Sequence, residues 1–202
     1  MQGIVAIVAS YLLGSISFSY LIAKWVKKID IRTVGSGNAG ATNTLRVIGL
    51  KAALAVLALD IAKGIAAVWI GKWLSGGNLW IAVLCGIAVI AGHNWPVYFG
   101  FRGGKGIATA IGVLATLHFF PALYAGIIAI AAVALTRYVS LGSLIFTALT
   151  PVFLLILDFP LPYVAGSALI FALAAFRHRT NIVKLIRGQE HKLAFKGKAK
   201  EG

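Results

Sequence analysis

Acidic side chains are scarce in this sequence. Only five of the 202 residues are Asp or Glu, against 19 Lys and Arg, and charged residues of both signs make up 12% of the chain. Hydrophobic residues account for 60%, and the mean hydropathy is +0.92. Because soluble domains carry about 25% charged residues, this composition excludes a soluble globular protein and indicates an integral membrane protein.

The scarcity of cysteine, histidine and carboxylates limits which disulfides, metal sites and cofactors the chain can hold. The one cysteine, Cys85, lies in an apolar run and has no partner for an internal disulfide. Four scattered histidines and few carboxylates give no metal-ligand spacing, so we expect neither a metal nor another cofactor. The net charge of +14 does not indicate nucleic-acid binding, because the basic residues gather in loops and in the tail. That distribution is typical of the cytoplasmic segments of a membrane protein.

The first 25 residues lack the marks of a cleavable signal peptide. They are hydrophobic from the third residue, have no basic start, and lead into Lys24, Lys27 and Lys28 instead of a small-residue cleavage site. Gly3–Trp25 is therefore predicted as a retained first span whose basic end lies in the cytoplasm.

The apolar runs predict an all-α, polytopic membrane protein with about seven transmembrane helices, the N-terminus outside and the C-terminus cytoplasmic. We expect one membrane-embedded domain over residues 1–202. After the first span, the predicted segments are Leu50–Ile70, Leu79–Ala91, Ile107–Leu117, Pro121–Thr136, Gly142–Leu157 and Tyr163–Phe176. The second and third of these six are short for a full span, so they are either short helices or a re-entrant pair.

A polar stretch interrupts the apolar chain near its middle. Gly92–Thr109 reads GHNWPVYFGFRGGKGIAT and contains a Gly-Gly-Lys-Gly core. Glycines that adopt positive φ can turn N–H groups inward, and such a nest beside a Lys holds an anion. Ile107 is predicted to begin a helix whose free N–H groups add to the same pocket. The alternative is a plain tight turn at the membrane surface, and the Walker spacing is absent.

A second polar stretch, Gly35–Arg46, reads GSGNAGATNTLR and is predicted as a cytoplasmic loop. It combines neutral hydrogen-bonding side chains with an Arg suited to bidentate phosphate contact. The alternative is an ordinary Gly/Asn turn that caps the next helix, but the length of the loop favours a binding role. Its candidate binding side chains are Ser36, Asn38, Thr42, Asn43 and Arg46.

The third polar stretch, His178–Glu190, reads HRTNIVKLIRGQE. His178 and Asn181 share one helix face if the last span continues past the membrane. Most of its basic residues are explained by attraction to anionic lipid, whereas Glu190 is nearly the only acidic residue on that side. All three stretches emerge on the cytoplasmic side in the predicted topology, which favours chemistry or binding at one face over passage through the bilayer.

Two charges, Asp60 and Lys63, fall inside a predicted span. Intramembrane charges are costly and usually paired, and a spacing of three on a helix lets them pair. We expect a structural pair that supports the site. Ser140 and Ser143, at the start of the sixth span, point back to the same membrane face. Ser140 fits a helix cap, and Ser143 is expected to line the site.

With these stretches in place, the chain resembles the PlsY family of bacterial glycerol-3-phosphate acyltransferases. The matching signatures are GSGNAGATN at 35–43, the whole of 92–109, and HRTNI…RGQE at 178–190, and the resemblance covers essentially the whole chain. The second signature departs mildly at Asn94, Trp95 and Arg102. The family more often carries Phe before the Pro and Lys before the Gly-Gly, so size and charge are conserved.

The resemblance implies that an acyl group passes from acyl phosphate to glycerol 3-phosphate, giving lysophosphatidic acid and phosphate. It also implies a bacterial inner-membrane location with the active site facing the cytoplasm, contact with membrane lipid, and a soluble partner enzyme that makes acyl phosphate. Two phosphate-bearing substrates need two anion cradles, and two Gly-rich stretches are present. The acyltransferase signature His-x-x-x-x-Asp is absent, which excludes a His–Asp base of that kind.

Because acyl phosphate is already activated, we expect the enzyme to align it and to stabilise charge, with no acyl-enzyme. Lys105 with the loop N–H groups is assigned to one phosphate, and Arg46 with the first stretch to the other. Asn181 or Ser143 would steady the oxyanion or orient the acceptor hydroxyl. His178 is the one side-chain base candidate, with a substrate phosphate as the alternative. The predicted catalytic residues are Ser36, Arg46, Lys105, Ser143, His178 and Asn181, and the predicted substrate-binding residues are Gly37, Asn38, Thr42, Asn43, His93, Gly103, Gly104 and Glu190.

Two alternatives from other classes stay open at this point. A small phosphate or anion transporter could use the same cradles, but it is expected to show polar pairs at the midplane and internal symmetry. The chain offers only Asp60 and Lys63 there, and no repeat. A lipid-binding membrane scaffold has no need for three such stretches on one side.

Overall fold

The computed structural model describes residues 1–193. Within that range the chain forms ten α-helices and two short 3-10 helices, and no strand. The elements are α1 (Gln2–Gly14), α2 (Phe18–Lys27), η1 (Ile31–Thr33), α3 (Ala41–Val47), α4 (Leu50–Leu74), α5 (Leu79–Asn94), η2 (Val97–Phe99), α6 (Ile107–Leu117), α7 (Phe119–Thr136), α8 (Val139–Ile156), α9 (Leu161–Arg177) and α10 (Arg179–Ile186).

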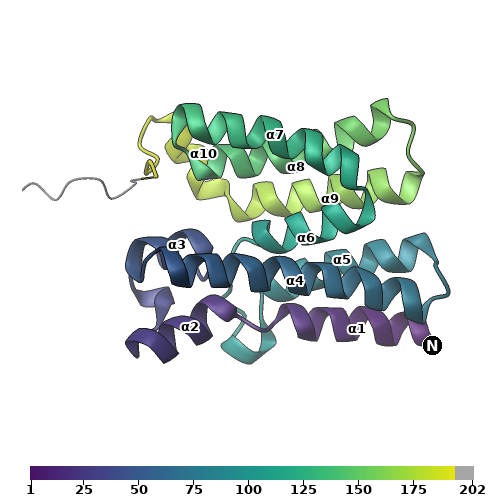
Figure 1. The fold of residues 1–202 in the computed structure, drawn as a ribbon, viewed down its shortest axis with the longest axis horizontal. Coiled ribbons are helices and arrows are strands. Elements are labelled where there is room, and N and C mark those ends of the chain that lie inside the picture. Colours follow the sequence, from purple (N-terminus) through teal and green to yellow (C-terminus); the bar gives the residue numbers. More distant parts are fainter. Residues whose placement is uncertain (194–202) are drawn as a thin grey trace, which may run out of the picture.

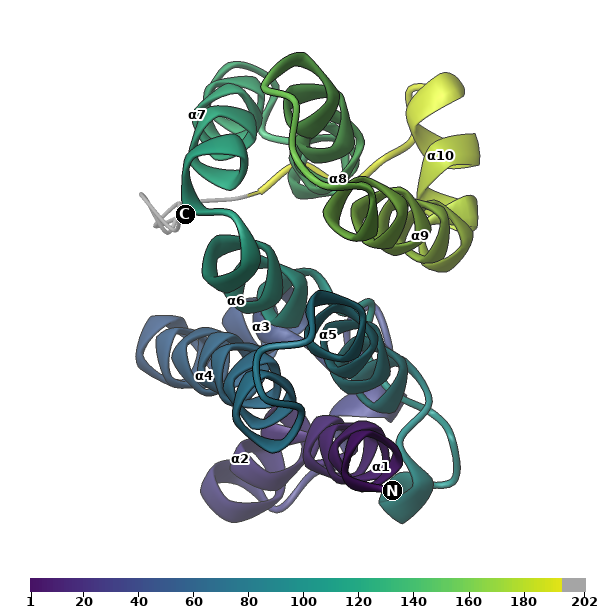
Figure 2. The same cartoon turned by 90° about the vertical axis from the view of Figure 1, so that its right-hand side faces the viewer.

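The long helices form two groups with α6 between them (Figures 1 and 2). Helices α1, α4 and α5 pack on one side of α6, and α7, α8 and α9 lie on the other. The most extensive contacts join α1 to α5, α4 to α6 and α7 to α8. Val89, Val113 and Ile170 belong to the core cluster that joins these groups. The N-terminus lies at the end of the bundle opposite α3 and α10 (Figure 1).

Backbones approach closely where glycines meet a neighbouring helix. A Cβ on Gly14 would overlap the backbone oxygen of Val89, and a Cβ on Gly92 would overlap that of Tyr11. Gly112 makes the same kind of approach between α6 and α4. Small residues at helix crossings are the usual means of packing in lipid, where apolar burial between helices gives little driving force.

The apolar helices fit the predicted membrane class. By length and composition, five helical segments within the described residues can cross a membrane, or six if the bent pair α9–α10 counts as one span. Helix α6 has only 11 residues, and at 1.5 Å per residue it covers about half of a bilayer core of about 30 Å. The all-α membrane architecture is confirmed. The count of about seven spans and the sidedness stay predictions.

The predicted first span is broken after Gly14, and α2 begins at Phe18. The Lys63 ammonium donates to the carbonyls of Gly14 at 3.1 Å and Ile16 at 2.9 Å, so it satisfies backbone groups that the break exposes. The same ammonium lies 2.7 Å from Asp60, and both side chains are 1% exposed. The predicted Asp60–Lys63 pair is therefore confirmed.

Three local predictions are corrected. The stretch predicted as one loop at 35–46 contains α3 from Ala41 onward. The last span does not continue straight past the membrane, because α9 and α10 meet at 67°. His178 stands at that bend, where its imidazole bonds to the Ala174 carbonyl and ends α9. Ser140 is not a cap, since α8 begins at Val139 with Tyr138 at its N-cap position.

Candidate active site

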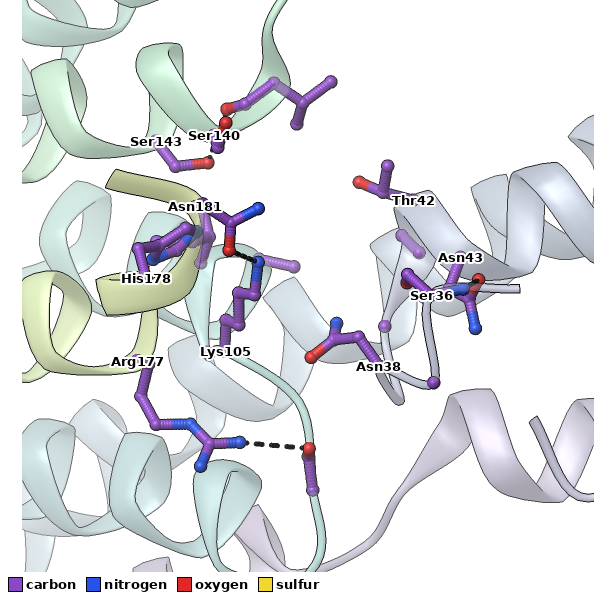
Figure 3. Close-up of a pocket in the computed structure, with 18 of the residues that line it drawn as sticks. Ser36, Asn38, Thr42, Asn43, Lys105, Ser140, Ser143, Arg177, His178 and Asn181 are labelled. Carbon is purple, nitrogen blue, oxygen red and sulfur yellow. Dashed lines mark hydrogen bonds between the residues drawn. The ribbon is translucent and has the colours of Figure 1, made fainter. Parts of the chain in front are cut away.

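The three polar stretches meet around one cavity of about 480 Å³. The first stretch lies on one side, and Lys105, His178 and Asn181 lie on the other (Figure 3). Leu57 and Ile111 give part of the wall an apolar surface. All predicted site residues except Gly104 line the cavity: Ser36, Gly37, Asn38, Thr42, Asn43, Arg46, His93, Gly103, Lys105, Ser143, His178, Asn181 and Glu190.

Asn43 holds the first stretch in shape. Its side chain is buried, and its Oδ1 accepts a 2.9 Å hydrogen bond from the Ser36 N–H. Its Nδ2 donates to the carbonyls of Ile31 at 3.1 Å and Val34 at 3.0 Å. Since both ends of the amide are bonded inside the protein, Asn43 positions the first stretch, and its predicted contact with substrate stays a prediction. It presents the Ser36 side chain to the cavity.

Gly104 also differs from its prediction. Its N–H donates to the His93 carbonyl at 3.1 Å, so this group does not face a ligand, and neither Gly103 nor Gly104 adopts positive φ. A Cβ on Gly104 would overlap both the Ala39 carbonyl oxygen and His93 Nε2. Gly104 is thus required for the close approach of the first stretch, the loop and α5. The left-handed conformation occurs instead at Gly106 (φ +81°), the N-cap of α6.

Arg177 fixes the same loop and was missed as a site residue. Its Nε donates to the Gly104 carbonyl at 3.1 Å, and its Nη2 donates to Gly104 at 2.6 Å and Gly103 at 3.2 Å (Figure 3). Its guanidinium lies over the Trp95 ring at 5.4 Å. In the sequence, Arg177 reads as the first residue of the basic tail. Its position directly before His178, a predicted site residue, was the signal that could have identified it.

Lys105, Asn181 and Glu190 form a hydrogen-bonded row. Lys105 Nζ donates to Asn181 Oδ1 at 2.5 Å, and Asn181 Nδ2 donates to the Glu190 carboxylate at 2.9 and 3.1 Å. Burial lowers the pKa of Lys105 to about 8, against the opposing effect of the Glu190 charge. Because the Asn181 N–H groups face Glu190, this geometry does not offer Asn181 as the predicted oxyanion donor.

His178 is held in one tautomer. Its Nδ1 lies 2.8 Å from the Ala174 carbonyl oxygen. Since a carbonyl can only accept, Nδ1 carries the proton, and Nε2 of the neutral ring keeps a lone pair. The ring is buried and lines the cavity. This arrangement suits the predicted role as a base.

The two serines of α8 differ in their hydrogen bonds. Ser143 Oγ donates to the Val139 carbonyl at 2.8 Å, so its proton is used within the helix. Ser140 Oγ is buried and has no hydrogen-bond partner among the described residues. Both line the cavity. Because an unpaired buried hydroxyl costs about 1–3 kcal/mol, Ser140 is the better candidate for a substrate contact.

No group of three or more His, Cys, Asp or Glu side chains within residues 1–193 is placed to hold a metal ion. The charged groups that reach the cavity are mainly cationic. They are Arg46, Lys105, Arg177 and Lys184, with Asp60 and Glu190 as the acidic members. Cationic side chains beside an apolar wall suit an anionic molecule with an apolar part.

Residues 4–188 match the family model described as glycerol-3-phosphate acyltransferase. The chain is 56% identical over 198 residues to the glycerol-3-phosphate acyltransferase of Shouchella clausii, covering 96% of this chain and 97% of that protein. It is 53% identical over 199 residues to the protein of the same name from Halalkalibacterium halodurans, with 96% and 97% covered.

Two solved structures have the same fold. Both are crystal structures of PlsY, an integral membrane glycerol 3-phosphate acyltransferase. The glycerol 3-phosphate form matches with a TM-score of 0.91 at 38% identity, and the lysophosphatidic acid form with 0.88 at 36% identity. Each match covers 96% of this chain and 96% of the PlsY chain.

Proposed function

Because this chain belongs to the glycerol-3-phosphate acyltransferase family of PlsY-type integral membrane enzymes, we propose that its donor is an acyl phosphate and its products are lysophosphatidic acid and phosphate. The observation that carries this proposal is the cavity, which is lined by cationic side chains beside an apolar wall. Such a cavity suits two phosphate-bearing substrates, one of which has a hydrocarbon chain. The ligands of the two similar PlsY structures agree with this choice of acceptor and product.

The two phosphates bind to different sides of the cavity. Lys105 and the first turn of α6, where Ile107 and Ala108 line the cavity, hold one phosphoryl group. Arg46, which also lines the cavity, holds the other phosphoryl group. The Ser36 and Asn38 side chains, which lie across the cavity from Lys105, assist it (Figure 3).

The transfer itself is a direct substitution at the acyl carbon. The free primary hydroxyl oxygen of glycerol 3-phosphate attacks this carbon and forms the ester bond. The bond from the acyl carbon to the bridging phosphate oxygen breaks, and the phosphate departs with the bonding pair. The hydroxyl proton passes to His178 Nε2 and then to the departing phosphate, or directly to that phosphate. The Ser140 hydroxyl and the Lys105 ammonium stabilise the negative charge that develops on the carbonyl oxygen.

We place the cavity at the cytoplasmic face of a bacterial inner membrane. Support comes from Lys24, Lys27 and Lys28, which lie at the end of α2, and from the basic residues of α10, since basic residues favour the cytoplasmic side. A soluble enzyme that makes acyl phosphate would then deliver the donor from that side.

The deciding experiment is phosphate release by the purified protein in lipid, given palmitoyl phosphate and glycerol 3-phosphate, beside a Lys105→Ala control. Release that requires both substrates and is lost in the control supports the proposal. Release without the acceptor would identify a hydrolase. Phosphate accumulation inside sealed vesicles without release would identify an anion transporter.

A further inference from the structure

A second polar cluster lies in the cavity wall, and the transfer described above does not use it. It joins Asp60 and Lys63 of α4 to His93 near the end of α5. Lys63 Nζ lies 2.7 Å from Asp60 and 3.0 Å from His93 Nδ1, and His93 Nδ1 lies 3.4 Å from Asp60. Asp60 and His93 both line the cavity, while Lys63 lies behind them and reaches the break between α1 and α2.

The protons of Lys63 can be counted. An ammonium has three protons to donate and no lone pair with which to accept. Three acceptors meet it with hydrogen-bond geometry: the Gly14 carbonyl at 3.1 Å, the Ile16 carbonyl at 2.9 Å and His93 Nδ1 at 3.0 Å. The Asp60 carboxylate balances the charge as a close ion pair, but its oxygens accept no hydrogen bond of good geometry.

The contact between Lys63 and Nδ1, shorter than the 3.4 Å from Nδ1 to Asp60, favours one tautomer of His93. If Nδ1 accepts from Lys63, it carries no proton, so the proton of the neutral ring is on Nε2. A Cβ on Gly104 would overlap Nε2, which places this atom beside the Gly103–Lys105 loop. No protein acceptor within residues 1–193 bonds to Nε2. The Nε2–H is thus a donor without a protein partner among the described residues, in the wall of the cavity.

We propose that Lys63 holds His93 as the Nε2–H tautomer, and that this N–H donates to an oxygen of the substrate bound beside the 103–105 loop. The inference rests on the proposed function, because that oxygen is the carbonyl or a phosphoryl oxygen of the acyl phosphate. His93 is then a catalytic residue, Lys63 is a positioning residue, and Asp60 balances the charge of Lys63. A neutral imidazole can polarise a carbonyl in this way.

The two cavity histidines therefore have opposite roles. A backbone carbonyl fixes the proton of His178 on Nδ1, which leaves a lone pair on Nε2. An ammonium fixes the proton of His93 on Nε2, which leaves the lone pair on Nδ1. One ring accepts a proton and the other donates a hydrogen bond, so exchanging their partners would remove both functions.

Two substitutions test the donor. A Gln amide N–H reaches about as far as Nε2–H, whereas an Asn amide reaches only as far as Nδ1. We expect His93→Asn to lower kcat about 100-fold, the typical effect of removing one oxyanion donor, and His93→Gln to keep kcat within about tenfold of the wild type. Equal losses in both variants would overturn the assignment.

The tautomer is tested without activity, by ¹⁵N NMR of the full-length protein labelled at histidine in lipid nanodiscs. His93 signals are identified by their absence in His93→Gln. The wild type is expected to show a protonated Nε2 and an unprotonated Nδ1, and Lys63→Met is expected to move the proton to Nδ1, facing Asp60. The matched control is Lys72→Met, since Lys72 lies at the far end of α4 and contacts the Thr116 carbonyl.

A protonated Nδ1 in the wild type overturns the inference, whatever the activity. The expected tautomer in a protein that transfers no acyl group would support the role of Lys63 and would refute the proposed reaction instead. Failure of the inference and failure of the proposed function are therefore distinguishable.

Discussion

Lys105 Nζ donates a 2.5 Å hydrogen bond to Oδ1 of Asn181, which connects the second polar stretch to the third on one side of the cavity (Figure 3). Asn181 in turn donates to Glu190, so the orientation of its amide is set from both ends. The ammonium is thereby held at a fixed place in the cavity wall. Burial at that place lowers the pKa of Lys105 to about 8, which puts its charge within reach of an ordinary pH titration.

We predict that substrate binding weakens as pH rises above about 8. Below its pKa of about 8, Lys105 is an ammonium; above it, the amine is neutral and attracts no phosphate. The KM of the substrate that it binds should rise about tenfold for each pH unit beyond this point, as expected for loss of one proton. Initial rates between pH 7 and 9.5, with each substrate varied in turn, measure the effect.

The control for this titration is Lys105→Arg. A guanidinium stays charged over the whole range, so KM in this variant should be flat with pH even if its absolute value is higher. A wild-type KM that does not change up to pH 9.5 would contradict the assignment of Lys105 to a phosphate.

We expect Gly104→Ala to lower kcat/KM about 100-fold. The added Cβ overlaps the Ala39 carbonyl and His93 Nε2, so the first stretch and the loop must move apart, and misplacement by about 1 Å can cost about 100-fold in rate. The matched control is Gly126→Ala on α7, where a Cβ meets no atom within 4 Å. Steady-state kinetics of the two variants should differ strongly, and equal kinetics would show that the close approach at Gly104 is not needed.

Asn43→Ala should both destabilise the protein and raise KM. It leaves the Ser36 N–H and the buried Ile31 carbonyl without partners, whereas the Val34 carbonyl keeps the Gly37 N–H. The cost is about 1–3 kcal/mol for each group that stays buried and unpaired, and the loop that presents Ser36 is released. Thermal melting and substrate titration measure the two effects.

A comparison variant separates these two effects. Asn78 caps α5 by accepting from the Ile81 N–H at 3.2 Å, and it does not line the cavity. Asn78→Ala should lower stability by about 1 kcal/mol, as for loss of a helix cap, and leave KM unchanged. If the two variants shift KM alike, Asn43 has no special role in the site.

The sequence was sufficient for features that depend on residues close along the chain. Long apolar runs locate the membrane helices, and the start of α6 after Gly106 follows from a Gly-rich stretch that ends in an apolar run. The spacing of Asp60 and Lys63 predicts their ion pair, because residues three apart on a helix are neighbours. The sequence also predicts that the three polar stretches gather on one side, and the structure brings them to one cavity, whereas the span count behind this expectation stays a prediction.

What the sequence did not reveal is which polar groups the protein uses for itself. Asn43, Asn181 and Ser143 all have the right chemistry for a ligand contact, but their hydrogen bonds go to partners in the protein. Which groups become hydrogen-bond partners depends on how the helices and loops pack. The amino-acid composition does not predict that packing. For the same reason, the meeting of Asp60 with His93 on another helix was not foreseen.

The last prediction concerns the base. His178→Asn keeps an N–H where Nδ1 donates to the Ala174 carbonyl but removes the Nε2 lone pair, so it separates the structural bond from the chemistry. If His178 takes the hydroxyl proton, kcat should fall by about 100-fold or more, as is typical for loss of a general base, with KM changed little.

The pH profile of kcat distinguishes the alternative. A His base gives a fall in kcat at low pH, where the ring is protonated and has no lone pair to accept the proton, and this limb should vanish in His178→Asn. A variant that keeps nearly full kcat with an unchanged profile would exclude His178 as the base. The departing phosphate would then take the hydroxyl proton itself, and the Nε2 lone pair of His178 would have no part in the transfer.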